Sequence, residues 1–171
     1  MNERKGLVSF KELPVTLVGD EIKVGQTAPE FTVLKQDLSD LKLSDLDGKI
    51  KVLSIAPSLD TRVCELQTIR FNNETTQVSD DVEIVSITVD LPFAQKRFCE
   101  ALDIKGHQVV SDHRDLDFGY KYGLVMKELR LLARAVIILD KDNVVRYIDI
   151  NNQVSQEPNY EAALDAVKNL V

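Results

Sequence analysis

The chain lacks several features that would define its class at once. It has no tryptophan and only two cysteines among 171 residues, too few for the disulfide framework of a secreted domain. Redox chemistry or plain burial must therefore explain the two thiols. No apolar run approaches the ~20 residues that cross a bilayer, and the first five residues lead into no apolar signal core. These absences favour the cytoplasm.

Positive charge is also scarce. Lysine and arginine number 21 against 28 acidic residues, which gives a net charge of -7. This balance argues against nucleic acids and anionic membranes as partners. The sequence contains no Gly-x-Gly-x-x-Gly, no phosphate loop and no carboxylate pair at the predicted crevice. His107 and His113 are isolated, with no ligand spacing to each other or to a cysteine. We expect no cofactor and no metal.

The chain has enough residues and apolar content for an ordinary core. With 44% hydrophobic residues, it can bury a core without metal or disulfide staples. No internal repeat, low-complexity segment or linker interrupts it. We therefore expect a single domain over residues 1–171.

Hydrophobic patterning predicts an α/β fold. The strands expected with most weight cover residues 51–56, 82–89, 134–139 and 144–150, with shorter strands at 31–34 and 41–43 and an N-terminal hairpin formed by 15–19 and 22–24. Helices are expected over residues 65–79, 91–102, 115–122 and 160–170. This order predicts a thioredoxin-like three-layer sandwich with a central mixed sheet flanked by helices.

The apolar residues of two helices suggest which side each one buries. In the first helix Val63, Leu66 and Ile69 recur at helical spacing. In the second, Ala94, Phe98 and Ala101 lie on one side. We expect these sides to face the core.

The most informative stretch is residues 57–64, which joins a buried strand to a helix. Asp60 and Thr61 are good N-cap residues, so Cys64 falls in the first helical turn. Unpaired backbone N–H groups and the helix dipole favour a thiolate there. The Thr61 hydroxyl, three residues before the sulfur, can lie beside it. A lone cysteine is more often inert packing, but this spacing indicates a reactive one.

Two further residues allow two interpretations each. Cys99, inside the helix after Pro92, is either a half-buried packing residue or a partner for Cys64 in a disulfide. Such a bridge needs Cα atoms within about 7 Å, which implies local rearrangement of the helices. Arg134 precedes an apolar strand. It is either exposed at the strand end or buried against an anion.

At this point the sequence resembles a known family. Residues 57–64 and 67–72 resemble the peroxidatic-cysteine region of bacterial thiol peroxidases, a group of atypical two-cysteine peroxiredoxins. Residues 90–99 resemble that family's resolving-cysteine segment, and residues 132–136 and 157–164 are also typical. The four motifs occur in the family's order and cover nearly the whole chain.

The resemblance implies roles for five residues. Cys64 would be the peroxidatic cysteine and Cys99 the resolving cysteine. Thr61 and Arg134 would orient the peroxide and stabilise the thiolate, and Pro57 would shield the pocket. The family also implies a homodimer, an intrachain disulfide, reduction by thioredoxin and a preference for alkyl hydroperoxides over hydrogen peroxide. The expected role is protection against oxidative stress.

Two departures from the family pattern concern the pocket. Arg62 stands where members often carry proline or glycine, and Ala56 stands where many carry a bulkier residue. The competing functions are a redox sensor or adaptor that passes oxidation to a partner protein, and a non-enzymatic module with two structural thiols. Turnover of peroxide with a dithiol donor distinguishes an enzyme from a sensor.

Overall fold

The structure is a computed structural model that describes residues 1–75 and 78–171. These residues form a central mixed sheet of seven strands. Its strand order is β11-β10-β5-β6-β7-β3-β4. The bounds are β3 (Thr32–Leu34), β4 (Asp40–Lys42), β5 (Ile50–Ile55), β6 (Val82–Thr88), β7 (Gln108–Ser111), β10 (Ala135–Leu139) and β11 (Val145–Ile150). β5, β6 and β7 run parallel, and the neighbours beyond them pair antiparallel.

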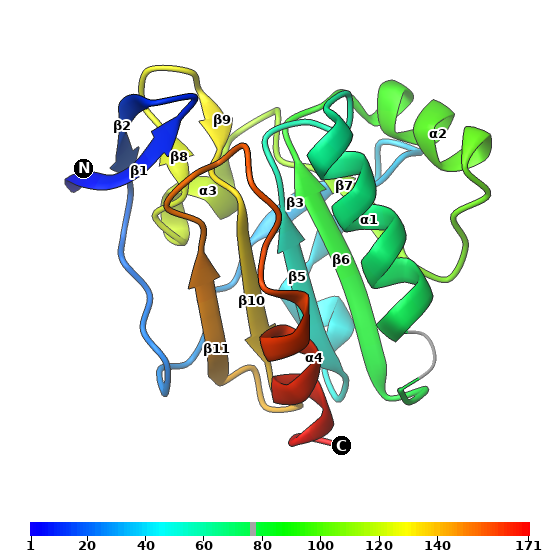
Figure 1. The fold of residues 1–171 in the computed structure, drawn as a ribbon. Helices are drawn as coiled ribbons and strands as arrows, with labels where there is room; N and C mark the ends of the chain where they lie inside the picture. The colour runs from blue at the N-terminus through cyan, green and yellow to red at the C-terminus, as the bar shows by residue number, and fades with distance from the viewer. Residues whose placement is uncertain (76–77) are drawn as a thin grey trace.

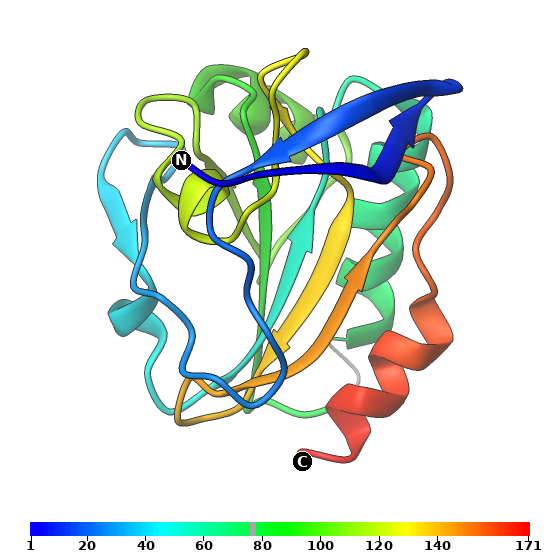
Figure 2. The same ribbon diagram turned by 90° about the vertical axis from the view of Figure 1, so that its left-hand side faces the viewer.

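Helices cover both faces of this sheet. They are α1 (Arg62–Thr75), α2 (Pro92–Ala101), α3 (Asp117–Lys121) and α4 (Tyr160–Lys168), with a short 3₁₀ helix η1 at Leu43–Leu46. α1 and α4 lie on one face, while α3 lies on the other (Figures 1 and 2). This arrangement confirms the predicted three-layer α/β sandwich.

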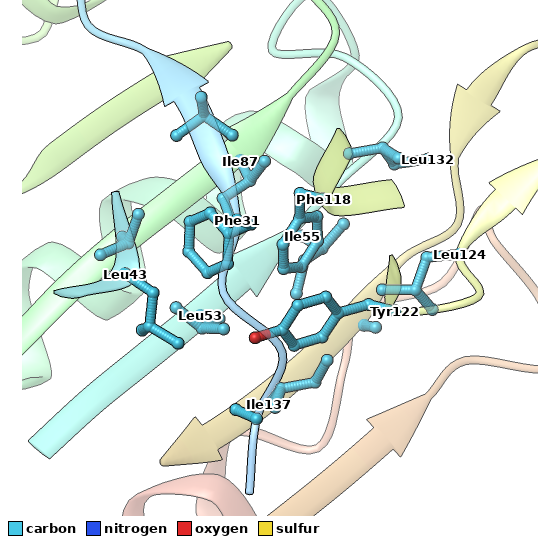
Figure 3. Close-up of a cluster of buried hydrophobic side chains, with 14 of the residues drawn as sticks. Phe31, Leu43, Leu53, Ile55, Ile87, Phe118, Tyr122, Leu124, Leu132 and Ile137 are labelled. Carbon is cyan, nitrogen blue, oxygen red and sulfur yellow. The ribbon is translucent and has the colours of Figure 1, made fainter. Parts of the chain in front are cut away.

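The sheet divides its side chains between two apolar layers. On the α3 face, Phe31, Phe118 and Tyr122 pack over the central strands (Figure 3). The rings of Phe31 and Phe118 meet edge to face with centroids 5.1 Å apart, a favoured aromatic geometry. On the opposite face, Phe71 of α1 and Tyr160 of α4 pack in a second cluster. Alternation along buried strands supplies both layers.

The N-terminal hairpin exists, but its predicted strands are partly wrong. β1 (Glu3–Phe10) pairs with β2 (Leu13–Val18), and residues 22–24 form no strand. Gly19 follows the end of β2, and its backbone passes against helix α3: a Cβ there would lie 2.1 Å from the Tyr120 carbonyl oxygen. The glycine therefore marks a close approach and not a hairpin turn. The hairpin continues into a second, four-stranded sheet with β8 (Val125–Met126) and β9 (Leu131–Leu132).

Most other predicted elements are confirmed with shifted ends. α1 begins at Arg62, and residues 76–77 of the predicted helix lie outside the described residues. α3 covers only Asp117–Lys121 of the predicted 115–122. Among the described residues, no helix has both the length and the apolarity to span a bilayer.

The apolar stripes of α1 and α2 are not the most buried sides of these helices. Leu66 is 40% exposed, and α1 instead buries a side made of Cys64, Gln67, Thr68 and Phe71. In α2 the buried residues are Pro92, Gln95 and Cys99. Both helices therefore turn a cysteine and a glutamine inward. The spacing of apolar residues does not predict this, because hydrogen-bonding partners elsewhere in the chain determine which polar side chains are buried.

Candidate active site

Cys64 lies where strand β5 passes into helix α1, at the carboxyl end of the parallel strands. The connecting segment, residues 57–61, is called the Cys64 loop below. The Glu65 N–H donates to the Thr61 carbonyl at 3.0 Å, so Thr61 is the N-cap and Cys64 lies in the first turn, as predicted. The Cys64 side chain is fully buried.

Two side chains donate hydrogen bonds to the Cys64 sulfur. The Thr61 hydroxyl lies 2.7 Å from Sγ, and the Arg134 Nη2 lies 3.0 Å from it. One donor is neutral and the other carries a full positive charge. Because both point at one buried sulfur, they stabilise an anionic sulfur and any negative charge that develops on an atom bonded to it.

Arg134 takes the buried alternative. It is only 2% exposed and directly precedes β10. Its Nε donates to the Val154 carbonyl and its Nη1 donates to Gln67 Oε1, each at 2.7 Å. Burying a cation without partners is costly; here three acceptors, the sulfur among them, satisfy the guanidinium and fix its plane.

Gln67 is a site residue that the sequence analysis missed. Besides accepting from Arg134, its Nε2 donates to Ser54 Oγ at 2.7 Å and to the Ile55 carbonyl at 3.3 Å. It therefore anchors the guanidinium to strand β5. The sequence spacing could have identified it, because Gln67 follows Cys64 by three residues and both side chains therefore share one helix face. Ser54, a lone polar residue in an apolar strand, was the matching signal.

The Thr61 hydroxyl has two acceptors within reach. It lies 2.7 Å from Cys64 Sγ and 3.2 Å from the Ser58 carbonyl oxygen. A hydroxyl has one proton to donate. With a thiolate, Thr61 donates to sulfur; with a thiol, it can accept the S–H and donate to Ser58. The hydroxyl thus fits both protonation states of Cys64.

The remaining candidates around Cys64 differ in exposure. Pro57 is buried at the start of the Cys64 loop, and Ala56 before it is 3% exposed. Arg62 is exposed, and in the described part of the chain no hydrogen bond or ion pair involves its guanidinium. The structure therefore brings together Cys64, Thr61 and Arg134, with Pro57 in the same loop.

Cys99 lies apart from this group, on α2. It is 9% exposed and packs with Leu59 of the Cys64 loop and Val109 of β7. Its sulfur accepts a hydrogen bond from Gln36 Nε2 at 3.3 Å. Burial raises the pKa of the Cys99 thiol, and the Gln36 bond opposes this only in part. Both cysteines are free thiols.

A cavity of about 330 Å³ opens beside Cys99. His107 lines it and shares a 2.7 Å hydrogen bond with Ser86. Burial lowers the pKa of His107 to about 4, so this imidazole is neutral near pH 7. No cluster of three metal-ligating side chains occurs among the residues that the structure describes.

Comparison with known proteins places this geometry in context. The family model described as Redoxin matches residues 23–164. The thiol peroxidase of Oceanobacillus iheyensis is 53% identical over 157 residues, which cover 92% of this chain and 95% of that protein. The thiol peroxidase of Bacillus subtilis is 48% identical, with 96% of this chain and 98% of that protein covered.

Solved structures agree on the fold. The crystal structure of a peroxiredoxin-like protein from Aquifex aeolicus superposes with a TM-score of 0.90 at 41% identity, covering 98% of this chain and 99% of that one. The thiol peroxidase from Chromobacterium violaceum superposes with a TM-score of 0.85 at 20% identity and covers 95% of each chain. The second likeness speaks for the fold alone.

Proposed function

The chain belongs to the thiol peroxidases of the Redoxin family and is a peroxidase enzyme, and from this premise we propose that Cys64 is the residue that reduces the peroxide. The observation that carries the proposal is the pair of donors, Thr61 and Arg134, on the buried Cys64 sulfur. A structural thiol has no need of a buried cation. A sulfur that must attack as a thiolate is stabilised by such a cation.

In the first step the Cys64 thiolate attacks one oxygen of the peroxide. The S–O bond forms as the O–O bond breaks, and the electron pair leaves with the other oxygen, which takes a proton and departs as alcohol or water. Cys64 becomes a sulfenic acid. The Thr61 and Arg134 donors are placed to stabilise the charge that spreads over the oxygens as the bond stretches.

Ionisation of the sulfur supplies the smaller share of the acceleration. An ordinary thiol with a pKa near 8.5 is about 3% ionised at pH 7, so complete ionisation gains only about 30-fold, or about 2 kcal/mol. The rest must come from interactions that strengthen in the transition state. The fixed Arg134 fork is the strongest candidate, since its plane is held by Gln67 and Val154 before peroxide arrives.

In the second step Cys99 captures the sulfenic acid. Its thiol attacks the Cys64 sulfur, an intrachain disulfide forms and water leaves. The two sulfurs have separate partners in the reduced fold, Gln36 on one side and Thr61 with Arg134 on the other. Formation of the disulfide therefore requires the Cys64 loop or helix α2 to rearrange, because the two sulfurs of any disulfide are bonded at about 2.0 Å.

We further propose that thioredoxin reduces the disulfide, that the enzyme works as a homodimer in the cytoplasm, and that alkyl hydroperoxides are preferred over hydrogen peroxide. These follow from the family resemblance. Leu91 and Phe93 at the start of α2 are 54% and 66% exposed, which supports contact between this end of α2 and another protein. A reducing compartment suits an enzyme that must return to two thiols in each cycle.

Coupled turnover tests the proposal. The parent enzyme should consume cumene hydroperoxide and hydrogen peroxide continuously with thioredoxin and its reductase, and faster with the alkyl peroxide. Cys64→Ser should consume neither, because serine is a far poorer nucleophile at neutral pH. Cys99→Ser should reduce about one equivalent per chain and then stop under thioredoxin recycling.

The same assay separates the alternatives. Substantial peroxidase activity in Cys64→Ser would overturn the assignment of Cys64. Full thioredoxin-driven turnover by Cys99→Ser would show that Cys99 is a packing residue. An interchain bridge in the parent, seen on non-reducing gels, would contradict the intrachain disulfide.

A further inference from the structure

Asp90 joins the two cysteine-bearing segments and has no role in the cycle described so far. It lies between the end of β6 at Thr88 and the start of α2 at Pro92. Its carboxylate accepts two hydrogen bonds from the Cys64 loop: the Ser58 hydroxyl donates to Oδ1 and the Leu59 N–H donates to Oδ2, each at 2.7 Å. These are charge-assisted bonds between the Cys64 loop and a residue two positions before helix α2.

The same carboxylate is tied to the buried side of α2. The Thr88 hydroxyl donates to Asp90 Oδ2 at 2.8 Å. Gln95, fully buried on α2, donates to the Thr88 hydroxyl oxygen at 3.1 Å and to the Val110 carbonyl at 2.7 Å. Gln95 and Cys99 are one helical turn apart. A continuous set of hydrogen bonds therefore runs from the Cys64 loop through Asp90 to the helix of Cys99.

Leu59 stands at the centre of this arrangement. Its backbone N–H is held by Asp90, and its side chain, 4% exposed, packs against Cys99. Two residues later, Thr61 donates to the Cys64 sulfur. Leu59 therefore links the anchored backbone of the Cys64 loop to the surroundings of Cys99, and a rearrangement of the loop that carries the Leu59 backbone with it breaks the bond to Asp90.

We propose that Asp90 is a positioning residue that holds the Cys64 loop in its peroxide-reactive arrangement and so sets how the sulfenic acid divides between two fates. This inference rests on the proposed roles of Cys64 and Cys99. In one fate, the Cys99 thiol and the Cys64 sulfenic acid give a disulfide and water. In the other, a second hydroperoxide gives up one oxygen to the sulfenic acid, which becomes a sulfinic acid as the peroxide leaves as alcohol or water. Stronger anchoring by Asp90 delays the first fate and favours the second.

The test is Asp90→Asn, which keeps the shape of the side chain and removes its charge. Stopped-flow mixing with cumene hydroperoxide gives the second-order rate of sulfenic acid formation. Quenching at set times with dimedone, followed by mass spectrometry, gives the rate of disulfide formation and the yield of sulfinic acid. We expect disulfide formation to accelerate about tenfold, since one accepting oxygen becomes an amide NH2 group that can only donate and the remaining bonds lose their charge. The peroxide concentration that inactivates half the enzyme should rise in parallel, while sulfenic acid formation slows by a smaller factor.

A matched control is Asp103→Asn, just beyond the other end of α2, where the carboxylate pairs with Lys105 on the surface. It should match the parent in all three measurements. If Asp90→Asn does not fold, Ser58→Ala carries the same test, because it removes one of the two bonds that the loop donates to Asp90, together with the bond from the Asp60 N–H to the Ser58 hydroxyl oxygen, and leaves the carboxylate in place. It should accelerate disulfide formation about threefold, as expected for loss of one modest hydrogen bond.

The ratio of the rate of disulfide formation to the rate of sulfenic acid formation tests the role of Asp90. A merely structural role for Asp90 would slow both steps and leave the sulfinic acid yield unchanged or higher, and that result would overturn the inference. If the parent forms the Cys64–Cys99 disulfide and Asp90→Asn leaves the ratio unchanged, only the role of Asp90 fails. If the parent forms no such disulfide, the proposed function fails and this inference with it.

Discussion

The two cysteines lie on successive helices, Cys64 in the first turn of α1 and Cys99 in the last turn of α2, and have very different polar surroundings. Each is buried and shares its helix face with a buried glutamine, Gln67 beside Cys64 and Gln95 beside Cys99. Gln67 orients a cation toward its cysteine. Gln95 is bonded away from its cysteine, to Thr88 and Val110.

The difference between the two buried thiols lies in the groups that face each sulfur. Cys99, with one neutral donor and apolar neighbours, has its pKa raised by burial, as expected when desolvation dominates. Cys64 is buried more completely, yet a guanidinium and a hydroxyl point at its sulfur. We therefore propose that Cys64 attacks the peroxide and that Cys99 reacts only after the fold rearranges.

The largest expected effect comes from removing the cation. Arg134→Met should lower the second-order rate with peroxide by about 100-fold or more, as for loss of a preorganised donor in other enzymes. Arg134→Lys should recover only part, since an ammonium lacks the planar fork that bonds Gln67, Val154 and the sulfur together. Rapid-mixing kinetics with cumene hydroperoxide measures the rate. Arg130→Met, at an exposed position, is the control, and a parent-like rate in Arg134→Met would place the arginine outside the mechanism.

Removing the hydroxyl beside Cys64 should have a smaller effect. Thr61→Val keeps the shape of the side chain and deletes the donor, so the peroxide rate should fall about tenfold, the scale of one lost hydrogen bond to a charged group. Thr61→Ser, which restores the hydroxyl, should recover most of the rate. Equal rates for the valine and serine variants would show that the hydroxyl does not act on the reacting atoms.

Replacing each of the two glutamines in turn tests the comparison between the Cys64 and Cys99 helices. Gln67→Leu should slow peroxide reduction several-fold, which corresponds to about 1 kcal/mol of activation free energy, because Arg134 loses the hydrogen bond to Gln67. Gln95→Leu should slow that rate by a smaller factor and alter mainly the rate of disulfide formation, since Gln95 reaches the Cys64 loop only through Thr88 and Asp90. The same rapid-mixing traces yield both rates. Equal slowing of peroxide reduction in both variants would remove the distinction between the two helices.

The smallest effect concerns the acidity of Cys99. Gln36→Leu removes the amide that donates to the Cys99 sulfur, and because that bond opposes the effect of burial, the Cys99 pKa should rise further. The pH dependence of alkylation in a Cys64→Ser background measures this. The midpoint should lie above the ordinary thiol value of about 8.5 before the change and move higher after it. A downward shift would mean that Gln36 does not stabilise the thiolate.

Sequence patterning predicted the strands and the Cys64 site better than it predicted the helix faces. Continuous apolar runs identify β5, β6 and β10 because strands buried on both faces need them. The short strand β7, with polar residues Gln108 and Ser111 at its ends, forms because β6 and β3 pair with it, and no local pattern announces this. Spacing within one segment placed Thr61 beside Cys64.

Long-range contacts explain the rest. Arg134 could be exposed or buried until its acceptors, Gln67 and Val154, were known. The apolar residues of α1 suggested that Leu66 would face inward, yet Gln67 is buried because Ser54, Ile55 and Arg134 satisfy its amide. A buried polar side chain is decided by partners elsewhere in the chain.

The most direct test of the central claim is to add one equivalent of peroxide to the two single-cysteine variants in the presence of dimedone and map the adducts by mass spectrometry. In Cys99→Ser, nearly every chain should carry the adduct on Cys64 within the mixing time. In Cys64→Ser, Cys99 should remain an unmodified thiol over the same period, because burial raises its pKa and the Gln36 amide that donates to its sulfur carries no charge. Equal labelling of Cys64 and Cys99 would contradict the account.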